Sequence, residues 1–357
     1  MTAPRLDIRL DRIQHNARTL VDRLGHRGVA VTGVTKATLG SPQVASALLA
    51  AGVAGLGESR IENIERLRRA GIRAHLTLIR SPMSSQAARV VAAADVSLNS
   101  DLGVVRALDA AARAIGRQHG IVVMVELGDL REGLMPRSVV AAARSIEGLA
   151  NVRLVGLGAN LACQSGVQPD DANMAVLSDL ATTIDPDRGR HLLVSGGNSA
   201  SIDWALTGAL GRVNDLRLGE AILLGREPSH RQPIDGLHLD AVSLSAEVIE
   251  CTLKPSRPWG SVGETAFGAA PTRHRAAAPD AARVIVAMGR QDVDPDGLVA
   301  PAGTVVRGAS SDHLVLQVAG STAPAVGTEL AFGVVGYAAL LRAMTSPFVE
   351  RRFSRGG

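Results

Sequence analysis

Val29-Ala30-Val31-Thr32-Gly33-Val34-Thr35-Lys36 is a nearly continuous apolar run that ends on a lysine. Strands that are buried on both faces of a parallel sheet have such runs, without alternation of apolar and polar residues. The chain of 357 residues contains only one other lysine, Lys254, because arginine supplies nearly all of the positive charge. The run therefore predicts a buried strand whose carboxyl end presents an amine.

An amine at the end of a buried strand has a chemistry that arginine lacks. Burial readily removes the proton of a lysine, which then attacks carbonyl carbons to form Schiff bases, whereas a guanidinium stays charged. A solvated charge at a strand end explains Lys36 equally well from this position alone. The ends of the other strands must decide between the two interpretations.

Seven further apolar runs alternate with helical patterns up to about residue 225. The runs are Ala54–Arg60, His75–Arg80, Asp95–Ser100, Ile121–Gly128, Arg153–Leu161, His191–Asn198 and Asp215–Gly225. The helical patterns are Ser41–Ala51, Arg60–Arg69, Ser85–Ala93, Ser100–Arg117, Ser138–Ile146, Asp170–Thr183 and Ser199–Leu210. Eight strand–helix units predict an α/β fold with a closed (β/α)8 barrel. An open doubly wound sheet is the alternative, but no Gly-x-Gly-x-x-Gly motif follows the first strand.

The pattern changes after Gly225, and Gln232-Pro233-Ile234-Asp235-Gly236 is typical of a linker. Beyond it we expect strands and no long helix; the strands are Ala241–Leu253, Ala282–Gly289, His313–Ala319 and Glu329–Val335. The segment Thr265–Asp280 is expected to be a loop. The sequence therefore predicts a barrel over residues 1–230 and a smaller, mainly β domain over residues 231–357, which the N-terminal run Leu6–Leu10 joins.

Composition excludes several classes of protein. Hydrophobic residues make up 46% and charged residues 20% of the chain, which indicates a packed globule and not a disordered chain. The net charge is only +4, and the arginines are scattered among acids, which argues against a nucleic-acid partner. No signal-like or membrane-length apolar stretch occurs, so we expect a cytoplasmic protein without a membrane partner. Cys163 and Cys251 form no metal-type cluster, and we expect no metal.

Polar residues gather at the expected strand ends, where barrel enzymes build their active sites. They are Lys36, Arg80, Asn99, Arg131, Asn160 and the loop Ser195-Gly196-Gly197-Asn198-Ser199. This loop leads into a helical pattern, and a glycine-bearing loop at a helix N-terminus offers free N–H groups to a phosphate. Ser195, Asn198 and Ser199 are therefore candidate cofactor contacts, and Gly219 would complete the cradle. An amine opposite a phosphate cradle predicts pyridoxal 5'-phosphate, whose aldehyde would react with Lys36.

Six segments spread over the chain form a recognisable set of motifs. They are Val34-Thr35-Lys36, Glu126-Leu127-Gly128-Asp129-Leu130-Arg131-Glu132-Gly133, Val194-Ser195-Gly196-Gly197-Asn198-Ser199, Leu216-Arg217-Leu218-Gly219-Glu220, Gly308-Ala309-Ser310-Ser311-Asp312-His313 and Gly336-Tyr337. Through them the chain resembles, over essentially its whole length, the alanine racemase type of pyridoxal-phosphate enzyme and, within it, the ornithine racemase branch. The resemblance implies a barrel followed by a β domain, a homodimer with shared active sites, and racemisation of an amino-acid substrate by removal and return of the Cα proton.

The resemblance also implies how the cofactor is held. Lys36 would bind its aldehyde and serve as one of two acid/base groups at the substrate Cα. Ser199, the backbone amides near Gly219 and Glu220, and Tyr337 would hold the phosphate.

Three further residues match positions around the cofactor ring in this family. Arg217 would face the pyridine nitrogen, and Arg131 would position the phenolic oxygen and the substrate carboxylate. Asn160 stands where alanine racemases have a ring-stacking histidine, so a polar group replaces the stacking ring beside the cofactor.

The second base departs from the family pattern. Racemases of this fold use a tyrosine of the partner subunit in a Gly-Tyr-x-Asp segment, which here is Gly289-Arg290-Gln291-Asp292. Arg290 is a poor base because a guanidinium keeps its proton. Asp292, Asp312 and His313 are the candidates, and histidine is best tuned to neutral pH.

Three function classes compete: an amino-acid racemase, a metal-assisted D-amino-acid lyase of the same fold, and a non-catalytic pyridoxal-phosphate carrier. The lyases carry a His-x-Cys metal pair in the β domain, and no cysteine stands at that spacing from His313. The carriers are bare barrels, whereas more than 100 residues follow the linker here. The sequence therefore favours a racemase of a basic amino acid such as ornithine, with alanine or broad specificity as the alternative.

Overall fold

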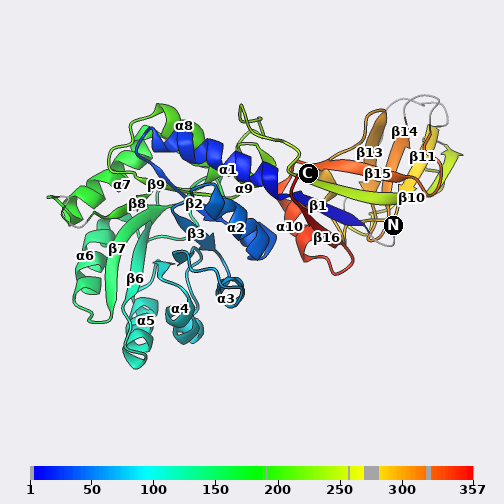
Figure 1. The fold of residues 1–357 in the computed structure, drawn as a ribbon. Coiled ribbons are helices and arrows are strands. Elements are labelled where there is room, and N and C mark those ends of the chain that lie inside the picture. Colours follow the sequence, from blue (N-terminus) through cyan, green and yellow to red (C-terminus); the bar gives the residue numbers. More distant parts are fainter. Residues whose placement is uncertain are drawn as a thin grey trace. The chain divides into compact units, whose positions relative to one another are not determined.

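A computed structural model describes residues 4–187, 189, 191–255, 258–268, 281–318 and 323–356. The chain forms two compact units, drawn in Figure 1, of which Leu10–His238 is the larger and the stretches before and after it form the smaller. The larger unit thus ends at His238 and not at residue 230. The first residues belong to the smaller unit because strand β1 (Arg5–Arg9) pairs with two of its strands.

The larger unit is a closed barrel of parallel strands, which confirms the predicted (β/α)8 architecture and excludes the open sheet. The barrel strands are β2 (Ala30–Val34), β3 (Gly55–Glu58), β4 (Leu76–Leu78), β5 (Val96–Asn99), β6 (His119–Val125), β7 (Val152–Ala159), β8 (Leu193–Ser195) and β9 (Asp215–Leu218). Strand β2 pairs with both β3 and β9, with Thr32 opposite Gly55 on one side and Arg217 on the other. This double pairing closes the sheet.

Helices surround these strands, as Figure 1 shows. They are α1 (Leu10–Gly25), α2 (Pro42–Ala50), α3 (Ile61–Arg69), α4 (Ala87–Ala93), α5 (Leu102–Ala114), α6 (Pro136–Glu147), α7 (Asp171–Ile184), α8 (Ile202–Thr207) and α9 (Glu220–Leu224). Short 3-10 turns are η1 (Lys36–Thr38), η2 (Ser84–Gln86) and η3 (Ser199–Ser201). Ser41, Asp101 and Asp170 cap α2, α5 and α7 with their side chains. Among the described residues, no helix is long and apolar enough to cross a membrane.

Two elements of this unit differ from the sequence-based expectation. Helix α1 was not predicted because polar residues interrupt its apolar positions, although Ile13, Leu20 and Leu24 keep helical spacing and are buried. The expected eighth strand, Asp215–Gly225, ends at Leu218, and the rest of the apolar run is helix α9. Periodicity alone does not separate a buried strand from a short buried helix.

The smaller unit is an eight-stranded, mostly antiparallel sheet, which confirms the predicted β domain. Besides β1 it contains β10 (Val242–Lys254), β11 (Ala281–Val286), β12 (Leu298–Val299), β13 (Thr304–Ala309), β14 (Leu314–Val318), β15 (Glu329–Val334) and β16 (Glu350–Ser354), with the 3-10 turn η4 (Pro295–Gly297) and helix α10 (Tyr337–Thr345). Helix α10 was not expected; its residues Leu340, Ala343 and Met344 are buried. Of the loop expected at Thr265–Asp280, residues 269–280 lie outside the described residues.

Gly156 marks a close approach of strands β7 and β8. A Cβ atom at this position would lie 2.2 Å from the carbonyl oxygen of Leu193 and 2.7 Å from its Cβ. Since a strand would have to move, we expect Gly156→Ala to lower the free energy of unfolding by about 1–3 kcal/mol. Gly25→Ala is the control, because nothing lies within 4 Å of the added Cβ. Equal urea midpoints for the two variants, measured by circular dichroism, would contradict the prediction.

Candidate active site

The carboxyl ends of the barrel strands carry the residues that the sequence singled out. Lys36 follows β2, Ser195 ends β8, and Arg217 is the third residue of β9. In a closed parallel barrel these ends meet at one rim. The structure therefore brings the following predicted residues to the rim of the barrel unit: Lys36, Arg131, Asn160, Ser195, Asn198, Ser199, Arg217, Gly219 and Glu220.

Lys36 is the first residue of the 3-10 turn η1. The backbone N–H of Thr38 donates to the Thr35 carbonyl oxygen at 3.0 Å, which tightens the turn directly after β2. Gly40 then takes a φ of +62°, and a Cβ there would lie 2.8 Å from Cβ of Asn63. A side chain at residue 40 is thus excluded both by conformation and by space. The half-buried Lys36 therefore stands on a tightly constrained loop.

Glu58, the last residue of strand β3, is hydrogen-bonded to this loop, and it was not singled out in the sequence analysis. Its buried carboxylate accepts hydrogen bonds from Thr35 Oγ1 at 3.3 Å, Asn63 Nδ2 at 3.2 Å and the Ser59 backbone N–H at 2.7 Å. Burial raises the pKa of Glu58, and these hydrogen bonds act against the rise. A carboxylate at the end of an otherwise apolar run was the signal that could have revealed it.

A row of hydrogen-bonded polar side chains crosses the barrel interior between β2, β8 and β9; its members are Thr32, Asp215, Ser195 and Arg217. Arg217 donates from Nη1 to Ser195 Oγ at 2.5 Å and from Nη2 to the Ala159 carbonyl oxygen at 2.7 Å. Ser195 Oγ donates in turn to Asp215, whose other oxygen accepts from Thr32 Oγ1 at 2.7 Å. Burial lowers the pKa of Arg217 and raises that of Asp215, and each opposite charge counters the other's shift. The sequence predicted Ser195 and Arg217 here but missed Asp215 and Thr32.

The beginnings of η3 and α9 lie side by side on the rim. Ser199 Oγ accepts a hydrogen bond from the Ala221 backbone N–H at 3.1 Å, which joins the two. Asn198 caps η3 with its side chain, and Gly219 is the N-cap of α9. A Cβ at Gly219 would lie 3.2 Å from the Val34 carbonyl oxygen, so the backbone approaches β2 closely there. The structure thus brings Ser199 and the start of α9 together, where the sequence predicts a phosphate cradle.

The Glu220 side chain lies near the lysine. Its Oε1 accepts a hydrogen bond from Arg231 Nη1 at 2.9 Å. Burial raises the pKa of Glu220, while the positive charges of Arg231 and Lys36 lower it. Lys36 is therefore within electrostatic reach of Glu220.

The loops after β6 and β7 carry the remaining predicted contacts. Arg131 is exposed and pairs with Glu132 through both Nε and Nη2, and the charges of both residues act on the pKa of Arg217. Asn160 Oδ1 accepts a hydrogen bond from Asn198 Nδ2 at 3.1 Å. The buried Nδ2 of Asn160 has no hydrogen-bond partner in the described part of the chain. This Nδ2 group is therefore a buried hydrogen-bond donor without a partner among the described residues.

The candidates for a second base belong to the smaller unit. Asp292 is buried, and its two oxygens accept hydrogen bonds from the Gly289 backbone N–H at 3.0 Å and from Ser346 Oγ at 3.1 Å. His313 is exposed on the neighbouring turn, with Nδ1 3.4 Å from Ser310 Oγ. Both oxygens of Asp292 are thus used in hydrogen bonds within its own unit, whereas the imidazole of His313 is exposed to solvent. Tyr337 is the first residue of α10 in the same unit.

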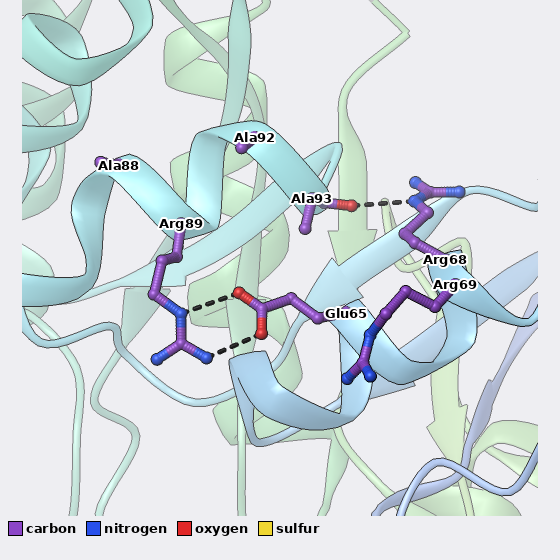
Figure 2. A pocket seen from close by; sticks show the side chains of 7 residues that line it. All are labelled: Glu65, Arg68, Arg69, Ala88, Arg89, Ala92 and Ala93. Atoms are coloured by element: carbon purple, nitrogen blue, oxygen red, sulfur yellow. Dashed lines mark hydrogen bonds and ion pairs between the residues drawn. The ribbon is translucent and has the colours of Figure 1, made fainter.

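A groove between helices α3 and α4 lies outside the ring of strands. Figure 2 shows its charged residues: Arg89 donates to both carboxylate oxygens of Glu65, at 2.7 and 2.8 Å, and Arg68 Nε donates to the Ala93 carbonyl oxygen at 2.9 Å. It is lined by Glu65, Arg68, Arg69, Ala88, Arg89, Ala92 and Ala93. No strand-end residue lines it, and the pairing indicates a helix–helix contact.

The family model that matches this chain is that of alanine racemase, N-terminal domain, and it matches residues 8–227. The chain belongs to the alanine racemase family. Lysine racemase from Thermotoga maritima is 38% identical over 98% of this chain and 98% of its own length. Ornithine racemase from Acetoanaerobium sticklandii is 34% identical over 98% of this chain and 99% of its own length. The predicted ornithine racemase-like branch of the alanine racemase family is thereby confirmed.

Solved structures of the alanine racemase family share the fold. Alanine racemase from D-cycloserine-producing Streptomyces lavendulae gives a TM-score of 0.75 with 21% identity, and the match covers 100% of this chain and 98% of that one. At this identity the likeness establishes the architecture of a barrel and a β domain. The chemistry has to be argued from the rim residues.

The hydrogen bonds of Asp292 make a prediction about stability. An asparagine would turn its NH2 group toward one of the two donors, so we expect Asp292→Asn to cost about 1–3 kcal/mol of unfolding free energy. Asp312→Asn is the control, because Asp312 is exposed and should change stability by less than roughly 0.5 kcal/mol. Chemical unfolding of both variants measures the difference. If Asp292→Asn were as stable as the parent, the hydrogen bonds of this carboxylate would not contribute to the stability of the fold.

Proposed function

We propose that this chain is a pyridoxal-phosphate-dependent racemase of a basic amino acid, ornithine or lysine. The observation that carries the proposal is the position of Lys36. This lysine lies on the same rim of the barrel as Arg217 and the Ser199 loop. Two racemases that are similar over their full length, named for lysine and ornithine, support the reaction and the class of substrate. A cytoplasmic location is part of this proposal.

The rim residues fit pyridoxal 5'-phosphate in three respects. Ser199 Oγ accepts from Ala221, so its own hydroxyl hydrogen is available to a phosphate oxygen. Gly219 is the N-cap of α9, so the first backbone N–H groups of that helix, beside Ser199, would face an anion bound there. The unpaired donor of Asn160 would find an acceptor on the cofactor.

The cofactor, once bound, supplies an electron sink that acidifies the Cα proton of an amino acid. Lys36 would hold the cofactor and move the proton on one face of Cα. Arg217, whose guanidinium keeps its proton, would donate to the ring nitrogen without protonating it, which would moderate the electron sink and suit simple proton removal and return. Arg131 offers a planar fork of donors to the substrate carboxylate.

The opposite face of Cα needs a second proton acceptor, because Lys36 serves only one. We assign this role to His313 of a partner subunit in a homodimer with shared active sites. His313 is exposed, whereas both oxygens of Asp292 accept hydrogen bonds within the fold. Histidine is also the side chain used most often as a general acid or base, whereas the guanidinium of Arg290 has no lone pair to accept a proton.

A panel of L- and D-amino acids, incubated with added pyridoxal phosphate, tests the reaction by the loss of optical rotation. We expect ornithine or lysine to racemise, and Lys36→Ala to lose both racemisation and the visible absorption that borohydride abolishes. Lys254→Ala is the matched control: it removes the other lysine, which lies exposed on β10 beside Glu250. Borohydride-sensitive absorption in Lys36→Ala would refute the proposal. Racemisation of alanine alone would shift the substrate, and elimination without racemisation would point to a lyase.

The second base is tested by following deuterium exchange at Cα from each enantiomer. His313→Ala should slow exchange from one enantiomer roughly 100-fold or more, while exchange from the other is largely kept, since general acid–base catalysis contributes about 10²–10⁴-fold. Mixing inactive Lys36→Ala with His313→Ala should restore part of the racemase activity, because a mixed dimer contains one intact site. Parent exchange rates from both enantiomers, or no recovery on mixing, would speak against a shared site with His313.

A further inference from the structure

Asp215 is a buried carboxylate to which the proposed function gives no role. Only 2% of it is exposed, and it begins strand β9 inside the barrel. Residues two apart on a strand face the same side, so Asp215 and Arg217 both face the interior. An isolated charge is costly in such a place, and a buried guanidinium needs an opposite charge close by. Asp215 supplies it, with Ser195 between the two groups.

The hydrogen bonds in this row run in one direction. An ionised carboxylate only accepts, so both Thr32 and Ser195 must donate to Asp215. The hydroxyl of Ser195 has a single hydrogen, and Asp215 uses it. The lone pairs of Ser195 Oγ are therefore left for Nη1 of Arg217 at 2.5 Å. Asp215 thus determines which way the serine turns.

The orientation of Arg217 follows from this arrangement. Its Nη1 donates to Ser195 Oγ and its Nη2 to the Ala159 carbonyl oxygen at 2.7 Å, and two directional hydrogen bonds from a planar fork of donors restrict how that plane can turn. We propose that Asp215 is a positioning residue, which acts through Ser195 to fix the plane of the Arg217 guanidinium against the cofactor ring nitrogen. The inference rests on the proposed function. It also moves Ser195 from a direct cofactor contact to the link between Asp215 and Arg217.

The same barrel contains a buried hydroxyl that serves as a control. Ser97 on β5 is fully buried; its Oγ is hydrogen-bonded to His119 Nε2 at 2.8 Å and accepts from Asn99 Nδ2 at 3.0 Å, and these bonds are separate from those of Asp215. Ser97→Ala removes a fully buried, hydrogen-bonded hydroxyl, as Ser195→Ala does, but from the outer face of a barrel strand. Any general effect of losing a buried hydroxyl therefore appears in both variants.

The test compares binding of pyridoxal phosphate with binding of its 1-deaza analogue, in which a C–H group replaces the ring nitrogen. Apoprotein of the parent, Ser195→Ala, Asp215→Asn and Ser97→Ala is titrated with each compound and followed by visible absorption. We expect Ser195→Ala and Asp215→Asn to weaken pyridoxal-phosphate binding about tenfold, as loss of a hydrogen bond to a charged group does, and to leave analogue binding nearly unchanged. Ser97→Ala should keep the parent ratio of the two dissociation constants.

The outcomes separate this inference from the proposed function. A parent protein that binds no pyridoxal phosphate would refute the proposed function. A parent that binds it, together with a Ser195→Ala variant that keeps the parent ratio, would overturn the positioning role alone. If Asp215→Asn does not fold because Arg217 loses its counter-charge, Ser195→Ala decides, since it keeps both charges in place.

Discussion

The pairing of strand β2 with strand β9 is the constraint on which the site depends. It closes the sheet, so that all eight strands point their carboxyl ends to one rim, and it places Thr32 opposite Arg217. Lys36 comes two residues after β2, and Gly219 comes directly after β9. The lysine and the glycine that begins α9 are thus neighbours in space although they are far apart in the chain. An open sheet would leave them at opposite edges.

The barrel interior is divided into an apolar and a polar side. Around β5 and β6 it is filled by the packed side chains of Val96, Leu98, Val122 and Met124. Toward β2, β8 and β9 it contains charged and hydroxyl groups that satisfy one another. The apolar side supplies the burial that stabilises the barrel, and it also withdraws water from the polar side. Interactions between Asp215 and Arg217 are consequently stronger than the same pair would have at a surface.

The sequence predicted those features that are written in consecutive residues. Apolar runs indicated the eight barrel strands, residue type at the strand ends pointed to Lys36 and Ser199, and the family resemblance pointed to Arg217. Asp215 and Glu58 were missed in the sequence analysis because their roles depend on residues that are distant in the chain. Ser195 and Asp215, for example, are opposite each other only once β8 and β9 pair. The choice between His313 and Asp292 likewise depended on exposure, because Ser346, which binds Asp292, lies more than fifty residues away in the chain. Also missed in the sequence analysis were helices α1 and α10, whose buried residues recur at helical intervals and do not form one consecutive apolar run.

The scarcity of lysine has an analytical consequence. The chain has only two side-chain amines: Lys36 on the barrel rim and Lys254 at the exposed end of β10. A reagent that modifies amines will therefore label two side chains, of which one reports on the rim and the other serves as an internal standard in the same molecule. The ratio of the two labels, read by mass spectrometry, gives the accessibility of the rim amine without any engineered probe.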